Sequence, residues 1–469
     1  MTTRRTAAAL LAAATLLLAA CGTRVDHDTI VQAAAGGGAQ MGTGEVLPGE
    51  EGVLGGSALG DAGQPGTPGA AEGELGAAGQ QGAAGSARAG ATGKPGAAGS
   101  ADGGQANREP IVIGSVGSYS GPSGVAYAQA PRAVQAWAAT INAKGGINGH
   151  PVKVIVMDDG ADAGKSRSQV QELVESRKAV AIVAAMTNAA TLASWKGYVE
   201  QKKVPVIGGD CGPGWDGGPT LFRQCVSSKD NLYGIAVMGA KHGKGKKFGG
   251  LFCQEADDCA YAEDRLFNKG DAKRAGLDPR YRARISLTQP DFTSECIQAR
   301  NAGVELLLVA ADPNTVARVA SSCRRQNFSP QFLQPDATMD ANTAAKPGFS
   351  DALIASRVFP FTGLSTPAYR EFDAAWKKYG GGQAPGPAAA MGWASAKVLE
   401  KAARGAGNDI SSASLLKELY SIRNDRFSGL TVPLTFAQGN GASAAKCLFF
   451  MKGAGGKWTA PQGDRLQCW

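Results

Sequence analysis

From Glu109 onward, short apolar runs alternate with amphipathic segments. Residues 111–114 read as a buried strand, and residues 134–141 carry an apolar stripe at helical spacing. Further strands are predicted at 152–157, 180–185, 204–207, 248–252, near 285 and at 306–310, with helices around 170–174, 192–198, 261–275, 296 and 319. This alternation is typical of doubly wound parallel sheets, and a break near 225–230 divides it into two lobes. The predicted fold class is therefore α/β, with two doubly wound parallel-sheet lobes.

Open parallel sheets bind ligands beyond the carboxyl ends of their strands. Two lobes that face each other with these ends inward form a cleft between them. The segments expected to line the cleft follow the predicted strands: 115–124, 186–189, 208–212, 253–261, 312–314 and 335–336.

The N-terminus predicts export. Arg4 and Arg5 precede an apolar run that ends at Ala20, which is the length of a signal-peptide core and too short to span a bilayer. Residues 18–22 (LAACG) resemble the bacterial lipoprotein box, so 1–20 is interpreted as a lipoprotein signal peptide and Cys21 as the lipidation site. The alternative is an ordinary signal peptide followed by a chance cysteine. A lipidated Cys21 would anchor the protein on the outer face of the cell membrane.

Residues 21–108 are rich in Gly and Ala and show no apolar periodicity, so we expect them to be disordered. Gly recurs at every third position in parts of this segment, which is the collagen period. The frame breaks at Glu72 and at 88–89, and Pro is sparse. A collagen-like linker that acts as a flexible tether, spanning roughly 50 Å, is favoured over a trimeric triple helix, and we expect a monomer.

The net charge does not indicate nucleic-acid binding. The net charge is +8, but Lys and Arg are spread along the chain, so no nucleic-acid partner is expected.

Of nine cysteines, all but Cys21 are candidates for disulfides, and pairing neighbours in chain order is the simplest of many connectivities. No C-x-x-C is present and the three His are far apart, so neither a metal site nor a cofactor is expected. The disulfide candidates are Cys211, Cys225, Cys253, Cys259, Cys296, Cys323, Cys447 and Cys468.

One motif comes close to a phosphate-binding loop. The sequence DDGADAGKS at 158–166 contains Gly164, Lys165 and Ser166 as a P-loop requires, but Asp159 stands where the first Gly belongs. Two carboxylates at this point would repel phosphate. We therefore interpret the motif as a turn from strand to helix, with Ser166 or Ser168 as the expected helix cap.

Three stretches carry a resemblance to a known family: IVIGSVGSYSGPSG at 111–124, INAKGGINGHPVKVIVMDDGAD at 141–162 and VPVIGG at 204–209. They closely resemble the leucine/isoleucine/valine-binding family of type I periplasmic binding proteins, the solute receptors of ABC importers. The resemblance implies two lobes joined by three crossing strands and closing on a small solute. Lobe 1 would contain 109–226 and 362–428, and lobe 2 would contain 227–361 and 429–469.

The resemblance also implies site residues. A hydroxyl after the third strand and backbone groups after the fourth hold a ligand carboxylate in amino-acid-binding members, and an acid in the second lobe holds the ammonium. These positions match Thr187, the 208–212 turn and Asp336, although Thr187 as a helix cap and Asp336 as a loop end are the alternatives. The expected ligand-binding residues are Tyr119, Ser120, Thr187, Gly208, Gly209, Asp210, Tyr261, Asp312 and Asp336.

The sequence departs from the family in ways that bear on the ligand. Cys211-Gly212 stands where a hydroxyl residue is common, and Asp312 stands where an aromatic residue often follows the strand. Asp210, Asp312 and Asp336 make the expected cleft acidic. An amino acid or a related amine-bearing polar solute is therefore favoured over a branched apolar one.

The expected disulfides fit this two-lobe arrangement. Cys211 and Cys225 would tie a cleft loop to the first crossing strand, and Cys447 and Cys468 would close the terminal hairpin. Cys296 and Cys323 would join neighbouring helices of the second lobe.

An enzyme is not expected. The sequence contains no G-x-S-x-G and no H-E-x-x-H, and three His supply little for acid–base chemistry. The leading hypothesis is a lipid-anchored solute receptor that delivers its ligand to the membrane subunits of an ABC permease. The alternative is a ligand-sensing or structural surface protein with the same fold and no transport role.

Overall fold

The computed structural model describes residues 108–336, 339, 342–441 and 445–469. The expected signal peptide, the Cys21 lipidation site and the Gly-rich segment before residue 108 lie outside the described residues.

The first half of this part forms a five-stranded sheet in the order β2-β1-β3-β4-β5, with every neighbouring pair parallel. β3 and β4 are buried along their whole length, as expected for strands covered on both faces. The strands are β1 (Ile111–Gly117), β2 (Val152–Asp158), β3 (Ala181–Ala185), β4 (Val206–Gly209) and β5 (Leu221–Phe222).

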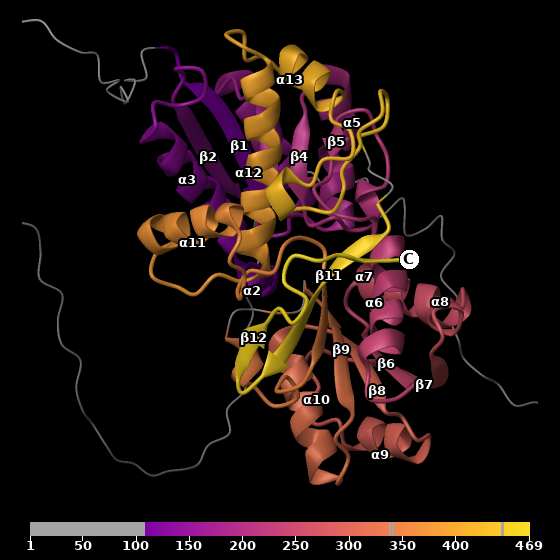
Figure 1. The fold of residues 1–469 in the computed structure, drawn as a ribbon. Helices are drawn as coiled ribbons and strands as arrows, with labels where there is room; N and C mark the ends of the chain where they lie inside the picture. Colours follow the sequence, from indigo (N-terminus) through magenta and orange to yellow (C-terminus); the bar gives the residue numbers. More distant parts are fainter. Residues whose placement is uncertain (1–107, 337–338, 340–341, 442–444) are drawn as a thin grey trace, which may run out of the picture. The chain divides into compact units, whose positions relative to one another are not determined.

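The second sheet has the order β12-β11-β10-β9-β8-β6-β7, and β13 pairs with β11. It is parallel from β7 to β10, whereas β11 returns antiparallel to β10 from the end of the chain (Figure 1). Its strands are β6 (Lys247–Cys253), β7 (Asp278–Ile285), β8 (Leu306–Ala310), β9 (Gln331–Pro335), β10 (Leu353–Ser356), β11 (Cys447–Ala454), β12 (Lys457–Thr459) and β13 (Gln467–Cys468). The two predicted parallel-sheet lobes are thus confirmed.

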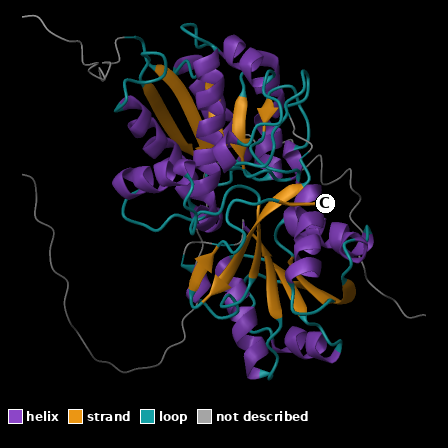
Figure 2. Cartoon of the chain, in the orientation of Figure 1, coloured by secondary structure: helices purple, strands orange, loops and turns teal. Residues whose placement is uncertain are grey.

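Helices connect most of the successive parallel strands and flank both sheets (Figure 2). α12 is buried over most of its length and packs against α3, where a Cβ added at Gly392 would stand 2.2 Å from the carbonyl oxygen of Ala130. Only glycine permits this close approach of the two helices. The α-helices are α2 (Gly121–Tyr127), α3 (Gln129–Asn142), α4 (Ala163–Gln171), α5 (Ala189–Lys202), α6 (Ser228–His242), α7 (Asp257–Glu263), α8 (Asp271–Arg274), α9 (Thr293–Asn301), α10 (Pro313–Arg325), α11 (Pro367–Tyr379), α12 (Pro387–Gly405) and α13 (Ser412–Leu419).

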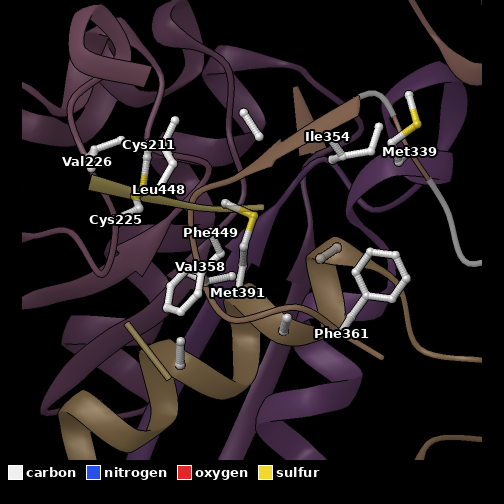
Figure 3. Close-up of a cluster of buried hydrophobic side chains, with 14 of the residues drawn as sticks. Cys211, Cys225, Val226, Met339, Ile354, Val358, Phe361, Met391, Leu448 and Phe449 are labelled. Carbon is white, nitrogen blue, oxygen red and sulfur yellow. A yellow bond between two sulfur atoms is a disulfide. The ribbon is translucent and has the colours of Figure 1, made fainter. Parts of the chain in front are cut away.

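The chain passes between the two sheets three times: after β5, after β10 and before β11. Buried apolar side chains from these connecting segments pack in one cluster with side chains of the loop after β4, of α12 and of β11 (Figure 3). The cluster includes Cys211, Cys225, Val226, Val358, Met391, Leu448 and Phe449. The strands of both sheets are therefore linked by a shared core where the chain crosses.

The near-P-loop sequence is a strand-to-helix turn, as predicted. Asp158 Oδ1 accepts hydrogen bonds from the backbone N–H groups of Tyr119 at 2.9 Å and Ser120 at 3.2 Å, and Asp159 Oδ1 accepts one from Ser118 Oγ at 2.8 Å. The two carboxylates therefore hold the loop that follows β1. The expected serine cap was wrong, because the Asp162 side chain caps α4 by accepting from the backbone N–H of Lys165.

All eight described cysteines form disulfides, and the pairing follows chain order as predicted. Cys296 on α9 is joined to Cys323 on α10, with Cα atoms 4.9 Å apart. The other pairs are Cys211–Cys225, Cys253–Cys259 and Cys447–Cys468. Two of these disulfides bring cysteines into the candidate site described next.

Candidate functional site

A cavity of about 300 Å³ lies where loops from the carboxyl ends of both sheets meet. It is lined by the end of α2, the segment after β4, the start of α6, the last residue of β9, and the segments after β6, β7, β8 and β10. This volume is at the lower end of the range for small-molecule pockets. Its apolar wall includes Leu232, Tyr261, Ala262 and Leu287, and its polar lining includes Asp210, Ser228, Asn231, Asp258 and Arg357.

A larger cavity of about 920 Å³ lies among α3, α11, α12 and residues 425–430. The charges that line it are already paired with one another: Lys144 with Glu371 at 3.0 Å, and Lys397 with Glu400 at 2.6 Å. Because these groups have their partners, we take the smaller cavity as the candidate site.

Arg357, directly after β10, carries the only positive side chain among the described residues that line the smaller cavity. Its Nε lies 2.7 Å from Asp336 Oδ1, its backbone N–H lies 2.8 Å from Asp336 Oδ2, and its Nη1 donates to the backbone oxygen of Asp210. Arg357 and Asp336 are 5 % and 0 % exposed. The guanidinium is therefore neutralised by Asp336 and connects the end of β10 to the loop after β4.

Asp210 is the buried acid of this cavity, with 4 % of its surface exposed. The pKa of its carboxyl is raised to about 7, mainly by burial and also by the charge of Asp258, while Arg357, the Gly212 N–H and the Trp215 indole act in the lowering direction. Its Oδ1 has no hydrogen-bond partner among the described residues. Such a carboxyl near its midpoint at neutral pH is poised to ionise when a cation arrives.

Asp258, in the first turn of α7, is a second acid of the lining. Burial raises the pKa of its carboxyl, and Arg357 counteracts this increase. Burial also raises the pKa of the Tyr127 hydroxyl, and the charges of Asp210 and Asp258 raise it further. Tyr127 therefore stays protonated and presents an O–H beside the two acids.

Among the residues expected from sequence, Asp210, Tyr261 and Asp312 line the cavity. Asp312 also caps α10, where its Oδ1 accepts from the backbone N–H groups of Asn314 at 2.9 Å and Thr315 at 3.2 Å. Its carboxylate is thus largely engaged within its own helix.

Asp336 is adjacent to the lining residue Pro335, but its carboxylate faces Arg357, Ser356 Oγ and the Arg357 backbone. Direct contact of Asp336 with a ligand ammonium is therefore less favoured than contact with Asp210. The role that the structure assigns to Asp336 is to balance the charge of Arg357.

Of the residues expected to hold a carboxylate, Thr187, Gly208 and Gly209 lie outside the lining, whereas residues 210–212 of the same turn line the cavity. Thr187 is 1 % exposed and its hydroxyl has no partner among the described residues; the helix cap beside it is Asn188, so Thr187 is not the cap. The N–H of Gly209 donates to Gln224 Oε1 at 3.0 Å. Gly208 has φ +73° and packs against Ser395, where a Cβ would lie 2.0 Å from the hydroxyl oxygen. The turn after β4 is thus held by protein groups.

Tyr119 and Ser120 belong to the loop fixed by the Asp158–Asp159 pair. The Tyr119 hydroxyl donates to the Ala184 carbonyl at 3.3 Å and lies 2.9 Å from Ser115 Oγ. Neither residue lines the cavity of about 300 Å³.

Sequence reasoning missed three polar lining residues, Ser228, Asn231 and Arg357, while Asp258 falls within the expected lining segment 253–261 but was not singled out. Arg357 had a signal, because a single Arg inside the apolar run 352–361 indicates a buried and paired charge. Ser228 and Asn231 carried no such signal, because polar residues at the start of a helix are usually interpreted as helix caps.

Two further properties bear on function. In the ranges that the structure describes, no helix is long and apolar enough to cross a membrane. Nor do three or more His, Cys, Asp or Glu side chains gather there as a metal site would require.

Comparison with known proteins agrees with this geometry. Residues 110–457 match the model of the periplasmic binding protein family. A curated protein of Pseudomonas aeruginosa described as an amino acid binding protein is 22% identical over 254 residues, which is 52% of this chain and 66% of that protein, short of two thirds of its length.

Solved structures show the same fold. A branched chain amino acid ABC transporter protein from Thermus thermophilus with bound valine superposes with a TM-score of 0.65 at 18% identity, covering 77% of this chain and 96% of that one. A fatty acid ABC transporter substrate-binding protein from Thermomonospora curvata gives a TM-score of 0.63 at 19% identity, covering 76% and 93%. At these identities the likeness establishes the fold, while the ligands of these two proteins, valine and a fatty acid, differ in charge and size.

Proposed function

Since this chain belongs to the periplasmic binding protein family, we propose that it is the lipid-anchored, extracytoplasmic solute receptor of an ABC importer. The proposed solute is an amino acid or a similar small, amine-bearing polar compound. The observation that carries this proposal is the cavity of about 300 Å³, which combines an apolar wall with the buried acids Asp210 and Asp258.

The charge balance of the cavity favours a cationic group on the ligand. Asp336 already neutralises Arg357, and the described lining offers no further positive side chain to balance Asp210 and Asp258. Burial strengthens Coulomb interactions, and an ammonium placed near these acids would stabilise their ionised forms. A ligand that carries only a carboxylate would meet two like charges and a guanidinium that is already paired.

The relatives support an amine-bearing solute in part. The Pseudomonas aeruginosa protein is described as binding amino acids, and the Thermus thermophilus structure holds valine. The Thermomonospora curvata protein is described as a fatty acid receptor, so this fold also serves anionic solutes. The acids of the cavity are what favour the amine in this chain.

Partners and organisation follow from the same proposal. We propose that lobe 1 comprises 109–226 and 362–428 and lobe 2 comprises 227–361 and 429–469, that the protein is a monomer, and that it docks on the membrane subunits of an ABC permease. Its role is binding without chemical conversion, as is usual in a family of solute-binding proteins.

A thermal-shift screen of the purified full chain tests the proposal. The panel contains amino acids, amides, polyamines, sugars and small carboxylic acids. A true solute at a hundredfold excess over its Kd stabilises the protein by about 2.7 kcal/mol. If no member of the panel raises the unfolding temperature, the receptor function is contradicted.

A further inference from the structure

Three side-chain oxygens in the lining of the candidate site are buried without a hydrogen-bond partner in the described part of the protein. They are Asp210 Oδ1, Ser228 Oγ and Asn231 Oδ1, on residues that are 4 %, 8 % and 8 % exposed. Buried polar atoms are normally paired, and leaving one unpaired costs roughly 1–3 kcal/mol. Three such atoms in the lining of one cavity indicate a ligand that supplies the missing donors.

The local sequence explains why these oxygens find no partner among the described residues. Ser227, not Ser228, caps α6, because the Ser227 side chain accepts from the backbone N–H of Asp230. Ser228 and Asn231 are three residues apart on α6, so they share one face of the helix. Asp210 approaches from the loop after β4, where Arg357 binds its backbone oxygen and leaves Oδ1 available.

We infer that Asp210, Ser228 and Asn231 together bind a primary ammonium group of the ligand, and that Ser228 and Asn231 determine specificity for primary amines. This inference rests on the proposed solute-binding function. A primary ammonium has three N–H donors and no acceptor, which matches three acceptor oxygens, one of them a carboxylate. A trimethylated nitrogen carries the same charge with no N–H to donate, so the site should distinguish the two.

The start of α6 raises one opposing effect. A helix N-terminus carries partial positive charge and favours anions. In this cavity the carboxyl groups of Asp210 and Asp258 already offset the partial positive charge of the α6 N-terminus, since they line the same pocket as Ser228. The net environment of the three oxygens is therefore acidic, which suits a cation.

The test uses the full chain and calorimetric titration with four probes of similar shape. They are L-leucine, isoamylamine, trimethylated isoamylamine and isocaproate, so that the amine, its N–H groups and the carboxylate are removed separately. We expect the two primary amines to bind at least tenfold more tightly than the trimethylated amine and isocaproate. The inference is overturned if either isocaproate or the trimethylated amine binds as tightly as the two primary amines, or more tightly.

Variants then assign the contacts. Ser228→Ala and Asn231→Ala should each weaken the best primary amine by roughly tenfold, the cost of one hydrogen bond to a charged donor. Ser294→Ala and Asn301→Ala, on exposed positions of α9, are matched controls and should leave affinity unchanged.

A readout on the ligand-free protein separates binding from a structural role. Because the Ser228 hydroxyl has no hydrogen-bond partner in the described part of the chain, Ser228→Ala should leave the unfolding temperature unchanged or raise it while affinity falls. The inference is overturned if Ser228→Ala and Asn231→Ala both leave the affinity for the primary amine unchanged. It is also overturned if the ligand-free variants lose as much unfolding free energy as they lose in binding free energy.

The two proposals fail in different ways. If none of the four probes and no member of the wider solute panel binds the wild-type protein, the solute-receptor function is overturned. If an amine-free solute of the panel binds tightly and Ser228→Ala leaves its affinity unchanged, the receptor function stands and the ammonium site is overturned.

Discussion

Arg357 and Asp336 form a buried ion pair in which the carboxylate accepts twice, from the side-chain Nε at 2.7 Å and from the backbone N–H of the same arginine at 2.8 Å. The pair stands at the ends of the neighbouring strands β9 and β10. It allows a guanidinium to reach the loop after β4 without leaving an uncompensated charge in the core.

Removal of Asp336 should therefore be costly. Asp336→Ala leaves the Arg357 guanidinium buried without its counter-ion, and we expect the free energy of unfolding to fall by roughly 3–5 kcal/mol in urea titrations. Asp373→Ala breaks the exposed pair with Lys377 and serves as the control, with an expected loss below about 1 kcal/mol. Similar small losses in both variants would show that Arg357 is balanced by another group.

Asp210 should give stability a characteristic pH dependence. Its pKa is about 7 in the folded protein against an ordinary value of 3.8, so between these pH values the folded state holds a proton that the unfolded state has released. Wild-type stability should fall as pH rises from about 4 to 7, relative to Asp210→Asn, which has no such proton. Urea unfolding at pH 4.5, 6 and 8 measures this difference, and a constant difference across the three pH values would contradict the raised pKa.

The disulfides should differ in what they stabilise. Replacing both Cys296 and Cys323 by Ala opens a link across 27 residues and should cost about 3.5 kcal/mol of unfolding free energy, against about 2.2 kcal/mol for Cys253 and Cys259, which are 6 residues apart.

The loss of ligand affinity should rank the two double variants in the opposite order, with the larger loss when Cys253 and Cys259 are replaced. These two cysteines line the cavity, whereas Cys296 and Cys323 do not. Urea unfolding and titration of each double variant test both rankings. An equal loss of affinity in the two variants would indicate a general loosening of the fold.

Thr187 offers a test of the carboxylate-holding role expected from sequence. Its hydroxyl is buried, unpartnered in the described structure and outside the cavity lining, so Thr187→Val should raise the unfolding free energy by about 1 kcal/mol and change ligand affinity by less than about twofold. A tenfold loss of affinity for L-leucine would instead place Thr187 in contact with the bound solute.

Cys21 lies outside the described residues, and its lipidation remains a prediction from the sequence. Cys21→Ser should move the protein from the membrane fraction to the soluble extracytoplasmic fraction, because two or more acyl chains are required for stable anchoring. Wild-type protein that is soluble after cell fractionation would contradict the lipoprotein assignment.

Much of the fold was predictable because buried parallel strands are nearly continuous apolar runs. The predicted strand 306–310 coincides with β8, and the apolar stripe at 134–141 lies within α3. β5 has only two residues, Leu221 and Phe222, and α13 only eight, so neither produces a recognisable pattern. α6 was missed because its face toward the site is polar at Ser228 and Asn231.

The site was less predictable because it depends on which partner each acid finds. Asp210, Asp312 and Asp336 look equivalent in sequence. In the structure Asp312 caps a helix, Asp336 neutralises Arg357, and Asp210 keeps one oxygen that no described residue contacts by a hydrogen bond. Only the three-dimensional contacts separate these roles.

The disulfides Cys211–Cys225 and Cys253–Cys259 place covalent links in walls of the cavity that come from the two different sheets. Loops cross-linked in this way have few backbone conformations to lose when a solute binds. Capture therefore carries a smaller entropic penalty than it does in a pocket with unconstrained loops, and this advantage is established when the thiols are oxidised, before any solute arrives.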